Sequence, residues 1–226
     1  MRLALPIILA LAGTAPAIAQ SEPVDYSTYV PTTELYTANE TPPETALVQR
    51  LFTLAFTEAC GAAIDGGFGG PEPQVFDFTY RDSYAEPGDA ERKFRLYQFN
   101  CNGGAYNFSS VFYGWDEVSG LEPVSFATPN AKPTYEDLDD NPDGRLVSLE
   151  PTGIGSRLLM SNAEVNEESG EIKAVGYWRG IGDASSSGVW QLADGEYSLT
   201  SYDIDASYDG EVNPVRVYPL SVPLPE

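Results

Sequence analysis

Apolar side chains recur every three or four positions from Leu47 to Ala59, with polar side chains between them. This period predicts one amphipathic helix over residues 43–60. The segment Thr41–Glu44 fits a capping box with proline in the first turn, and Gly61 fits a carboxyl-terminal stop. We therefore expect a single helix near the amino-terminal end, with its apolar face in a core.

Beyond this helix the apolar positions alternate with polar ones, which is the period of a half-buried strand. The clearest case is Phe76, Phe78 and Tyr80, which would share one face. Glycine, proline and asparagine separate the alternating segments, as they do in turns. We expect strands at residues 75–80, 93–100, 105–113, 121–126, 145–149, 157–163, 172–179, 188–192, 196–204 and 212–220.

One helix followed by about eight to ten short strands predicts an α+β, mainly β fold, with antiparallel sheets packed as a sandwich or an open barrel. Residues 101–104 and 194–195 predict turns between strands, and residues 130–143 predict an acidic, proline-containing loop. No linker-rich boundary divides the sequence, so we expect a single β-rich domain over residues 41–226. A waist in this domain would fall at residues 131–144.

At the amino terminus, an apolar run from Leu3 to Leu11 precedes the small-residue site at residues 17–19. These features predict a secretory signal peptide over residues 1–19. The run is about half of the ~20 residues that a membrane-spanning helix needs, so we favour the signal peptide over an anchor. The mature chain, with a polar arm over residues 20–40, is then expected in the periplasm or outside the cell, without a transmembrane segment.

The charge composition excludes several classes of function. The chain carries 34 acidic and 12 basic residues, a net charge of −22 that would repel a phosphate backbone, so nucleic acid is not expected as a partner. The absence of histidine excludes Ser-His-Asp and Cys-His nucleophile systems and histidine-ligated zinc. A hydrophobic content of 42% is ample for a folded core.

The two cysteines, Cys60 and Cys101, have only each other as partners. An oxidising compartment favours a disulfide between them, which would close a loop of about 40 residues and stabilise the fold by roughly 3–4 kcal/mol. The alternative is a pair of buried free thiols. A redox-active pair is disfavoured because the C-x-x-C spacing is absent. We expect a structural disulfide.

Residues 139–150 fit the twelve-residue calcium loop at every required position. Alternate side chains would offer oxygen atoms, the fourth ligand would be a backbone carbonyl, and the last residue would bind through its carboxylate. Proline and glycine on both sides spoil the helices of an EF-hand, so the alternative is an acidic turn leading into a strand. The predicted Ca²⁺ ligands are Asp139, Asn141, Asp143, Arg145 and Glu150.

Three stretches of the sequence share their order and spacing with one known pattern. The first is Cys101-Asn102-Gly103-Gly104-Ala105-Tyr106-Asn107, the second begins Ser161-Asn162-Ala163, and the third is Arg179-Gly180-Ile181-Gly182-Asp183, followed by Trp190. Over about residues 93–220 the chain resembles a family of exported proteobacterial proteins of unknown function. The resemblance implies an exported, β-rich protein and offers no activity.

The third stretch includes Arg179, Gly180, Gly182 and Asp183, which we call the signature turn. Directly after this turn the sequence differs from the family. The family has a cysteine directly after Gly-Asp and a second one further along, where this sequence has Ala184 and Tyr208. The joint loss of both cysteines fits a family disulfide and fits poorly with catalytic cysteines.

The serine-rich segment at residues 182–188 would suit a nucleophile loop only if a base lay nearby. Histidine is absent and no lysine stands at S-x-x-K spacing, so we expect a tight turn instead. Arg179 stands beside Tyr177 and Trp178, where it would bind an anion, stack on a sugar or, more commonly, pair with a nearby carboxylate.

These observations predict an exported, disulfide-bonded, non-catalytic binding or envelope-accessory protein. Two alternatives remain open. One is a hydrolase of envelope glycans that uses carboxylates alone. The other is an acidic inhibitor of a cationic hydrolase such as lysozyme, since a cationic envelope or secreted protein is the partner that a negative surface would attract.

Overall fold

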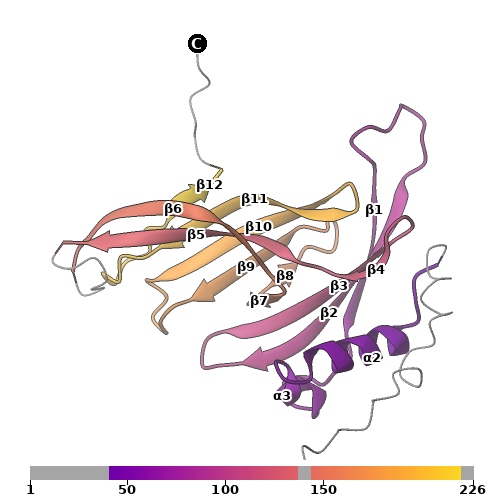
Figure 1. The fold of residues 1–226 in the computed structure, drawn as a ribbon, viewed down its shortest axis with the longest axis horizontal. Helices are drawn as coiled ribbons and strands as arrows, with labels where there is room; N and C mark the ends of the chain where they lie inside the picture. The colour runs from indigo at the N-terminus through magenta and orange to yellow at the C-terminus, as the bar shows by residue number, and fades with distance from the viewer. Residues whose placement is uncertain (1–40, 137–143, 220–226) are drawn as a thin grey trace, which may run out of the picture.

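The computed structural model describes residues 41–136 and 144–219 (Figure 1). The described chain is mainly β with antiparallel sheets and a short helix, which confirms the predicted fold class. The elements are α2 (Thr45–Phe56), α3 (Gly61–Ile64), β1 (Gln74–Tyr80), β2 (Arg92–Gly103), β3 (Phe108–Asp116), β4 (Gly120–Pro123), β5 (Phe126–Tyr135), β6 (Leu146–Arg157), β7 (Leu159–Ser161), β8 (Glu164–Val165), β9 (Ile172–Tyr177), β10 (Ser185–Ala193), β11 (Glu196–Asp205) and β12 (Val215–Tyr218).

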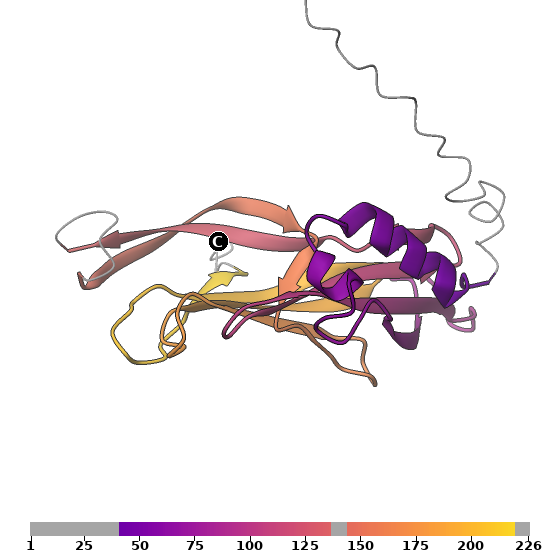
Figure 2. The ribbon, with the colours of Figure 1, turned by 90° about the horizontal axis from the view of Figure 1, so that it is seen from below.

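The strands form three antiparallel sheets. Sheet A has the order β1-β2-β3-β4, with β7 also paired to β3. Sheet B is the two-stranded hairpin β5–β6, and sheet C has the order β12-β11-β10-β9-β8. Sheet B lies across one face of sheet C and leaves the opposite face open (Figure 2). The open face of sheet C is the surface on which the candidate site is found.

The main core joins the three sheets through aromatic rings. Phe126 of β5 lies 5.4 Å from Phe112 of β3, 5.5 Å from Trp190 of β10 and 5.9 Å from Tyr197 of β11, measured between ring centroids. Each of these four side chains is buried. Burial of a side chain of this size contributes roughly 1.5–3 kcal/mol, so this cluster fixes the sheets against one another.

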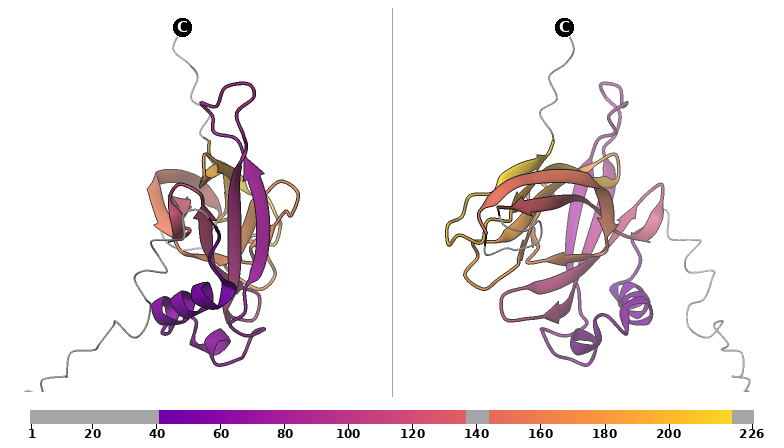
Figure 3. Two further views of the ribbon diagram at one scale, coloured as in Figure 1. Left: turned by 90° about the vertical axis from the view of Figure 1, so that its right-hand side faces the viewer. Right: turned by 60° about the vertical axis from the view of Figure 1, so that its left-hand side comes forward.

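A second core lies on the other face of sheet A, where α2 packs (Figure 3). Phe52 of the helix stacks on Phe99 of β2 with 4.3 Å between ring centroids, and Phe56 meets Tyr113 of β3 edge-on. The apolar period that predicted the helix therefore supplies this contact. Because α2 covers one face of β2 and the main core covers the other, this strand is buried on both sides.

The helix is shorter than expected. It spans Thr45–Phe56, and Glu44 at its start makes no capping hydrogen bond through its side chain, so the predicted capping box is wrong. Gly61 does not end the helix either, because it begins the short α3 with a backbone outside the left-handed region. The chain turns before that point because Cys60 is tied to β2.

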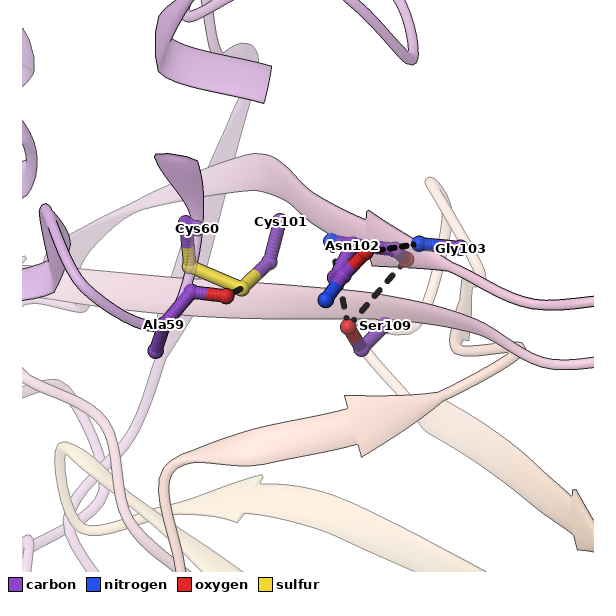
Figure 4. Close-up of a disulfide and its surroundings, with 6 residues drawn as sticks. All are labelled: Ala59, Cys60, Cys101, Asn102, Gly103 and Ser109. Atoms are coloured by element: carbon purple, nitrogen blue, oxygen red, sulfur yellow. Dashed lines mark hydrogen bonds between the residues drawn. A yellow bond between two sulfur atoms is a disulfide. The ribbon is translucent and has the colours of Figure 1, made fainter. Parts of the chain in front are cut away.

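The disulfide between Cys60 and Cys101 is present, with Cα atoms 4.3 Å apart and both residues buried (Figure 4). Cys101 sits where the β2–β3 register shifts between Asn100 and Asn102. A bulge of this kind redirects a side chain, and here Cys101 joins the core that packs against α2. Next to this bulge, the Ser109 hydroxyl oxygen accepts a hydrogen bond of 3.2 Å from the Asn102 backbone N–H. The expected disulfide is confirmed.

Three predicted loop assignments are wrong. The tight turn expected over residues 182–188 is one of them, because strand β10 begins at Ser185. Residues 130–135 belong to strand β5 rather than to the acidic loop, because Tyr135 is buried and its hydroxyl donates to the Ala206 carbonyl at 2.9 Å. β5 pairs only with β6 in the described chain, and an edge strand tolerates proline. The first predicted turn also lies later, since β2 continues to Gly103 and Gly104 N–H donates to the Asn107 carbonyl at 2.7 Å.

Among the described residues no helix is both long and apolar enough to cross a membrane. The predicted signal peptide and polar arm lie outside the described residues. Both stay predictions.

Candidate functional site: an aromatic groove on sheet C

The three sequence stretches that carry the family resemblance meet at the edge of β9, beyond the part of that edge that pairs with β8. Asn107, from the β2–β3 turn, donates its side-chain N–H to the Tyr177 carbonyl at 2.8 Å and accepts the Tyr177 N–H at 3.0 Å. The asparagine amide thus makes the two hydrogen bonds that a neighbouring strand would make. It occupies backbone groups that would otherwise pair with another chain.

Asn162, which follows β7, extends this contact. Its side-chain nitrogen donates to the Val175 carbonyl at 2.9 Å and to the Asn107 side-chain oxygen at 3.0 Å. Its side-chain oxygen accepts the Phe108 N–H at 2.9 Å. The backbone of Asn162 is left-handed, with φ of 45°, a conformation that asparagine tolerates better than most residues. Together these bonds hold the β2–β3 turn against β9.

The signature turn closes on the loop before β12. Arg179 donates through Nε to Asp183 at 2.6 Å, donates to the same carboxylate through Nη2, and donates to the Tyr208 carbonyl at 2.6 Å. Asp183 is 1% exposed and also accepts the Gly210 N–H at 2.8 Å. The hydrogen bonds from Arg179, followed by that from Gly210, lower the pKa of Asp183 to about 2. Arg179 is therefore paired to a nearby carboxylate, the commonest of its three predicted roles.

The two signature glycines lie next to tyrosine rings. A Cβ atom on Gly180 would stand 3.4 Å from the ring of Tyr106, and one on Gly182 would stand 3.6 Å from the ring of Tyr177. Gly182 also has φ of +80°, which disfavours any other residue. The signature turn therefore packs against the rings of Tyr106 and Tyr177.

Next to these contacts lies an open groove of about 450 Å³, which we call the aromatic groove. Its floor is the outer face of β9 and β10, and one wall comes from the β2–β3 turn, where Tyr106 is 40% and Phe108 is 55% exposed. Phe68 packs edge-on against Phe108 at 6.3 Å between ring centroids. The groove is lined by Tyr106, Phe108, Asn162, Glu164, Lys173, Ala174, Val175, Tyr177, Ser187, Gly188, Val189 and Asp203.

The charged side chains of the aromatic groove all have neighbours of opposite charge. Lys173 Nζ lies 3.0 Å from a Glu171 carboxylate oxygen, and Glu164 stands directly across from Lys173 in the β8–β9 ladder. Asp203 receives two hydrogen bonds from Arg216, at 2.5 Å and 3.2 Å. The lining of the groove is mainly apolar, and its one lysine and two carboxylates leave it close to neutral, although the whole chain carries a charge of −22.

A smaller cleft of about 210 Å³ lies between the β3–β4 turn and the β10–β11 turn. It contains three carboxylates, those of Asp116, Glu122 and Glu196. Asp116 accepts the backbone N–H groups of Val118 and Ser119 at 2.6 Å and 3.0 Å, so its role in the turn is structural. Glu122 and Glu196 are the carboxylates left at this cleft.

The predicted calcium ligands Asp139, Asn141 and Asp143 lie outside the described residues, so the site as a whole stays a prediction. The Arg145 carbonyl accepts the Glu136 N–H at 3.0 Å, and its side chain pairs with Glu136 at 2.6 Å. Glu150 lies in the extended strand β6, about 16 Å further along at ~3.3 Å per residue. Within the described ranges no three acidic, cysteine or histidine residues cluster as a metal site.

Sequence reasoning identified Arg179, Asp183 and their glycines, but it did not identify Tyr106 and Phe108 as a wall of a groove. The signal was present only in part, since both residues flank the Asn107 of the first stretch. Their exposure depends on where the β2–β3 turn falls, and that turn lies later than predicted. Comparison of the chain with protein-family models, with curated proteins and with solved structures finds no match.

Proposed function

We propose that the protein is an exported, non-catalytic binding protein of the cell envelope and that the aromatic groove is its binding site. The observation that carries this proposal is the gathering of Tyr106, Phe108 and Tyr177 at one open groove, whose lining is mainly apolar and nearly neutral in charge. Exposed aromatic side chains at a groove are characteristic of recognition surfaces, because they bury much area for little loss of side-chain freedom.

The chemistry of the groove supports binding rather than catalysis. Asp203 is paired with Arg216 and Lys173 with Glu171, so both charged groups have a structural partner. Ser187, the one serine among the lining residues of the groove, has neither histidine nor an unpaired lysine among them. Export is supported by the disulfide and by the predicted signal peptide.

Sedimentation with isolated envelope fragments tests the proposal. We expect wild-type protein to sediment with the fragments and Phe108→Ala to reduce the bound fraction at least fivefold. Tyr84→Ala removes an aromatic side chain that is 74% exposed far along the chain, between β1 and β2, and should bind as wild type. Equal binding by all three proteins, or no binding by wild type, contradicts the proposal. Intact mass from a periplasmic extract tests export, since the mature chain should begin at Gln20.

A carboxylate hydrolase is the second candidate, and it is favoured by Glu122 and Glu196 at one cleft. Incubation of purified envelope glycan with the protein should then release reducing ends, and Glu122→Gln and Glu196→Gln should each abolish that release. Glu86→Gln changes a carboxylate outside the cleft and serves as the control. Activity that survives both cleft substitutions excludes this mechanism.

A further inference from the structure

We propose that the ligand of the aromatic groove is an uncharged glycan chain that lies across β9 and β10. This inference rests on the proposed function, since it names the class of ligand for the same groove. Three properties of the groove support it: the aromatic rings, the few polar groups set in a mainly apolar lining, and the nearly balanced charges.

The aromatic rings suit the apolar faces of sugar rings. A pyranose presents C–H groups on its faces and hydroxyls around its rim, so it packs on an aromatic ring while its rim hydrogen-bonds elsewhere. Tyr106 and Tyr177 rest against the glycines of the signature turn, and Phe108 is braced by Phe68. Rings that are already held in place lose little freedom when a ligand binds.

The polar groups of the groove suit the rim of such a ligand. The Ser187 hydroxyl makes no hydrogen bond within the described chain, and it lies on β10 opposite Asp203 of β11 and Val175 of β9. Asp203 and Lys173 keep hydrogen-bonding capacity beyond their ion pairs, because a carboxylate accepts about four bonds and an ammonium donates three. A hydroxyl-rich ligand therefore finds both donors and acceptors between the aromatic rings.

The balance of charge argues against ionic ligands. A polyanion would be repelled by a chain of net charge −22, and a cationic peptide would find Asp203 already paired with Arg216, which leaves Glu164 as the carboxylate of the lining outside an ion pair. Glu164, Lys173 and Asp203 each have an opposite charge beside them. A peptide cannot add as a strand at the β9 edge next to the groove, because Asn107 and Asn162 already bind the backbone of Tyr177 and Val175.

Isothermal titration with defined oligosaccharides tests the inference. Hexamers of β-1,4-linked glucose and of β-1,4-linked N-acetylglucosamine serve as neutral probes, and a hexamer of galacturonate serves as the anionic one. We expect at least one neutral hexamer to bind and the anionic one to bind at least tenfold more weakly. Phe108→Ala and Tyr106→Ala should each weaken neutral binding at least tenfold, whereas Tyr84→Ala, outside the groove, should change it less than twofold.

The outcomes separate this inference from the proposed function. If neither neutral hexamer binds but envelope sedimentation still depends on Phe108, the glycan inference is overturned and the proposed function stands. If sedimentation and titration both fail, the proposed function falls with it. Tighter binding of galacturonate, or neutral binding that Phe108→Ala leaves unchanged, also overturns the inference. Circular dichroism of each variant ensures that a loss of binding is not a loss of fold.

Discussion

The side-chain amide of Asn162 donates a hydrogen bond to the side-chain oxygen of Asn107 across 3.0 Å, although the two residues are 55 positions apart in the chain. Through this pair the β2–β3 turn, the segment after β7 and the edge of β9 become one hydrogen-bonded unit. The unit carries Tyr106 and Phe108 on one side and the signature turn on the other. The wall of the aromatic groove therefore depends on two asparagines.

Asn162→Ala removes the hydrogen bonds to Val175, Asn107 and Phe108, and we expect it to lower the free energy of unfolding by about 2–3 kcal/mol. Urea unfolding followed by circular dichroism measures the change. Asn162→Gly is the matched control because glycine adopts the left-handed backbone without strain. Hydrogen-bond loss predicts that both variants are destabilised, whereas wild-type stability in Asn162→Gly would show that only the backbone conformation matters.

The hydrogen-bonded carboxylate of Asp183 should make the free energy of unfolding depend on pH. Its pKa is lowered from 3.8 to about 2 in the folded protein, chiefly by the hydrogen bonds from Arg179. Between these values the unfolded chain binds more protons than the folded one, so the contribution of Asp183 is present above about pH 4 and is lost as the pH falls towards 2.

Asp183→Asn should remove that contribution. We expect the wild type to be more stable than the variant at pH 7, and the difference to shrink as the pH is lowered from 4 to 2. Urea midpoints of both proteins at pH 7, 4, 3 and 2 measure this difference directly, because other carboxylates titrate equally in both. A difference that stays constant down to pH 2 would contradict a lowered pKa.

Removal of the disulfide between Cys60 and Cys101 should lower the free energy of unfolding. Cys60→Ser/Cys101→Ser opens a loop whose ends are 41 residues apart, and we expect a loss of roughly 3–4 kcal/mol in the free energy of unfolding. The loss should match that of the wild type treated with reductant, measured by the same urea titration. If reductant leaves the wild type unchanged while the double serine variant is destabilised, the effect comes from packing in the α2 core and not from the bond.

The sequence predicted those parts of the fold that depend on local pattern. The apolar period of α2 and the alternation in β1 are properties of neighbouring residues, and the disulfide followed from there being two cysteines. The sequence does not predict strand β5 because Pro133 and the acidic residues after it are typical of a loop, whereas a strand with a partner on one side only tolerates proline.

The candidate site was predictable only in fragments. Arg179 and Asp183 are four residues apart, so their pairing is a local event. The contacts of Asn107 with Tyr177 span 70 residues, and no periodicity in the sequence encodes them. The exposure of Phe108 depends on the same contacts, since an alternating pattern alone places an apolar residue in a core. Non-local pairing therefore decides which aromatic residues form the groove.

The calcium motif at residues 139–150 predicts that Ca²⁺ raises the melting temperature, whereas the geometry of the β5–β6 hairpin predicts no change. A bound ion would draw the Arg145 carbonyl and the Glu150 carboxylate to within about 2.3–2.6 Å of one centre. The carbonyl instead accepts the Glu136 N–H, and strand β6 carries Glu150 about 16 Å away. Binding would have to unravel the start of β6 to bring Glu150 to that centre, so we expect the same melting temperature in millimolar Ca²⁺ as in EDTA. A rise that Mg²⁺ does not reproduce and that Glu150→Gln abolishes would show that the motif prevails over the strand.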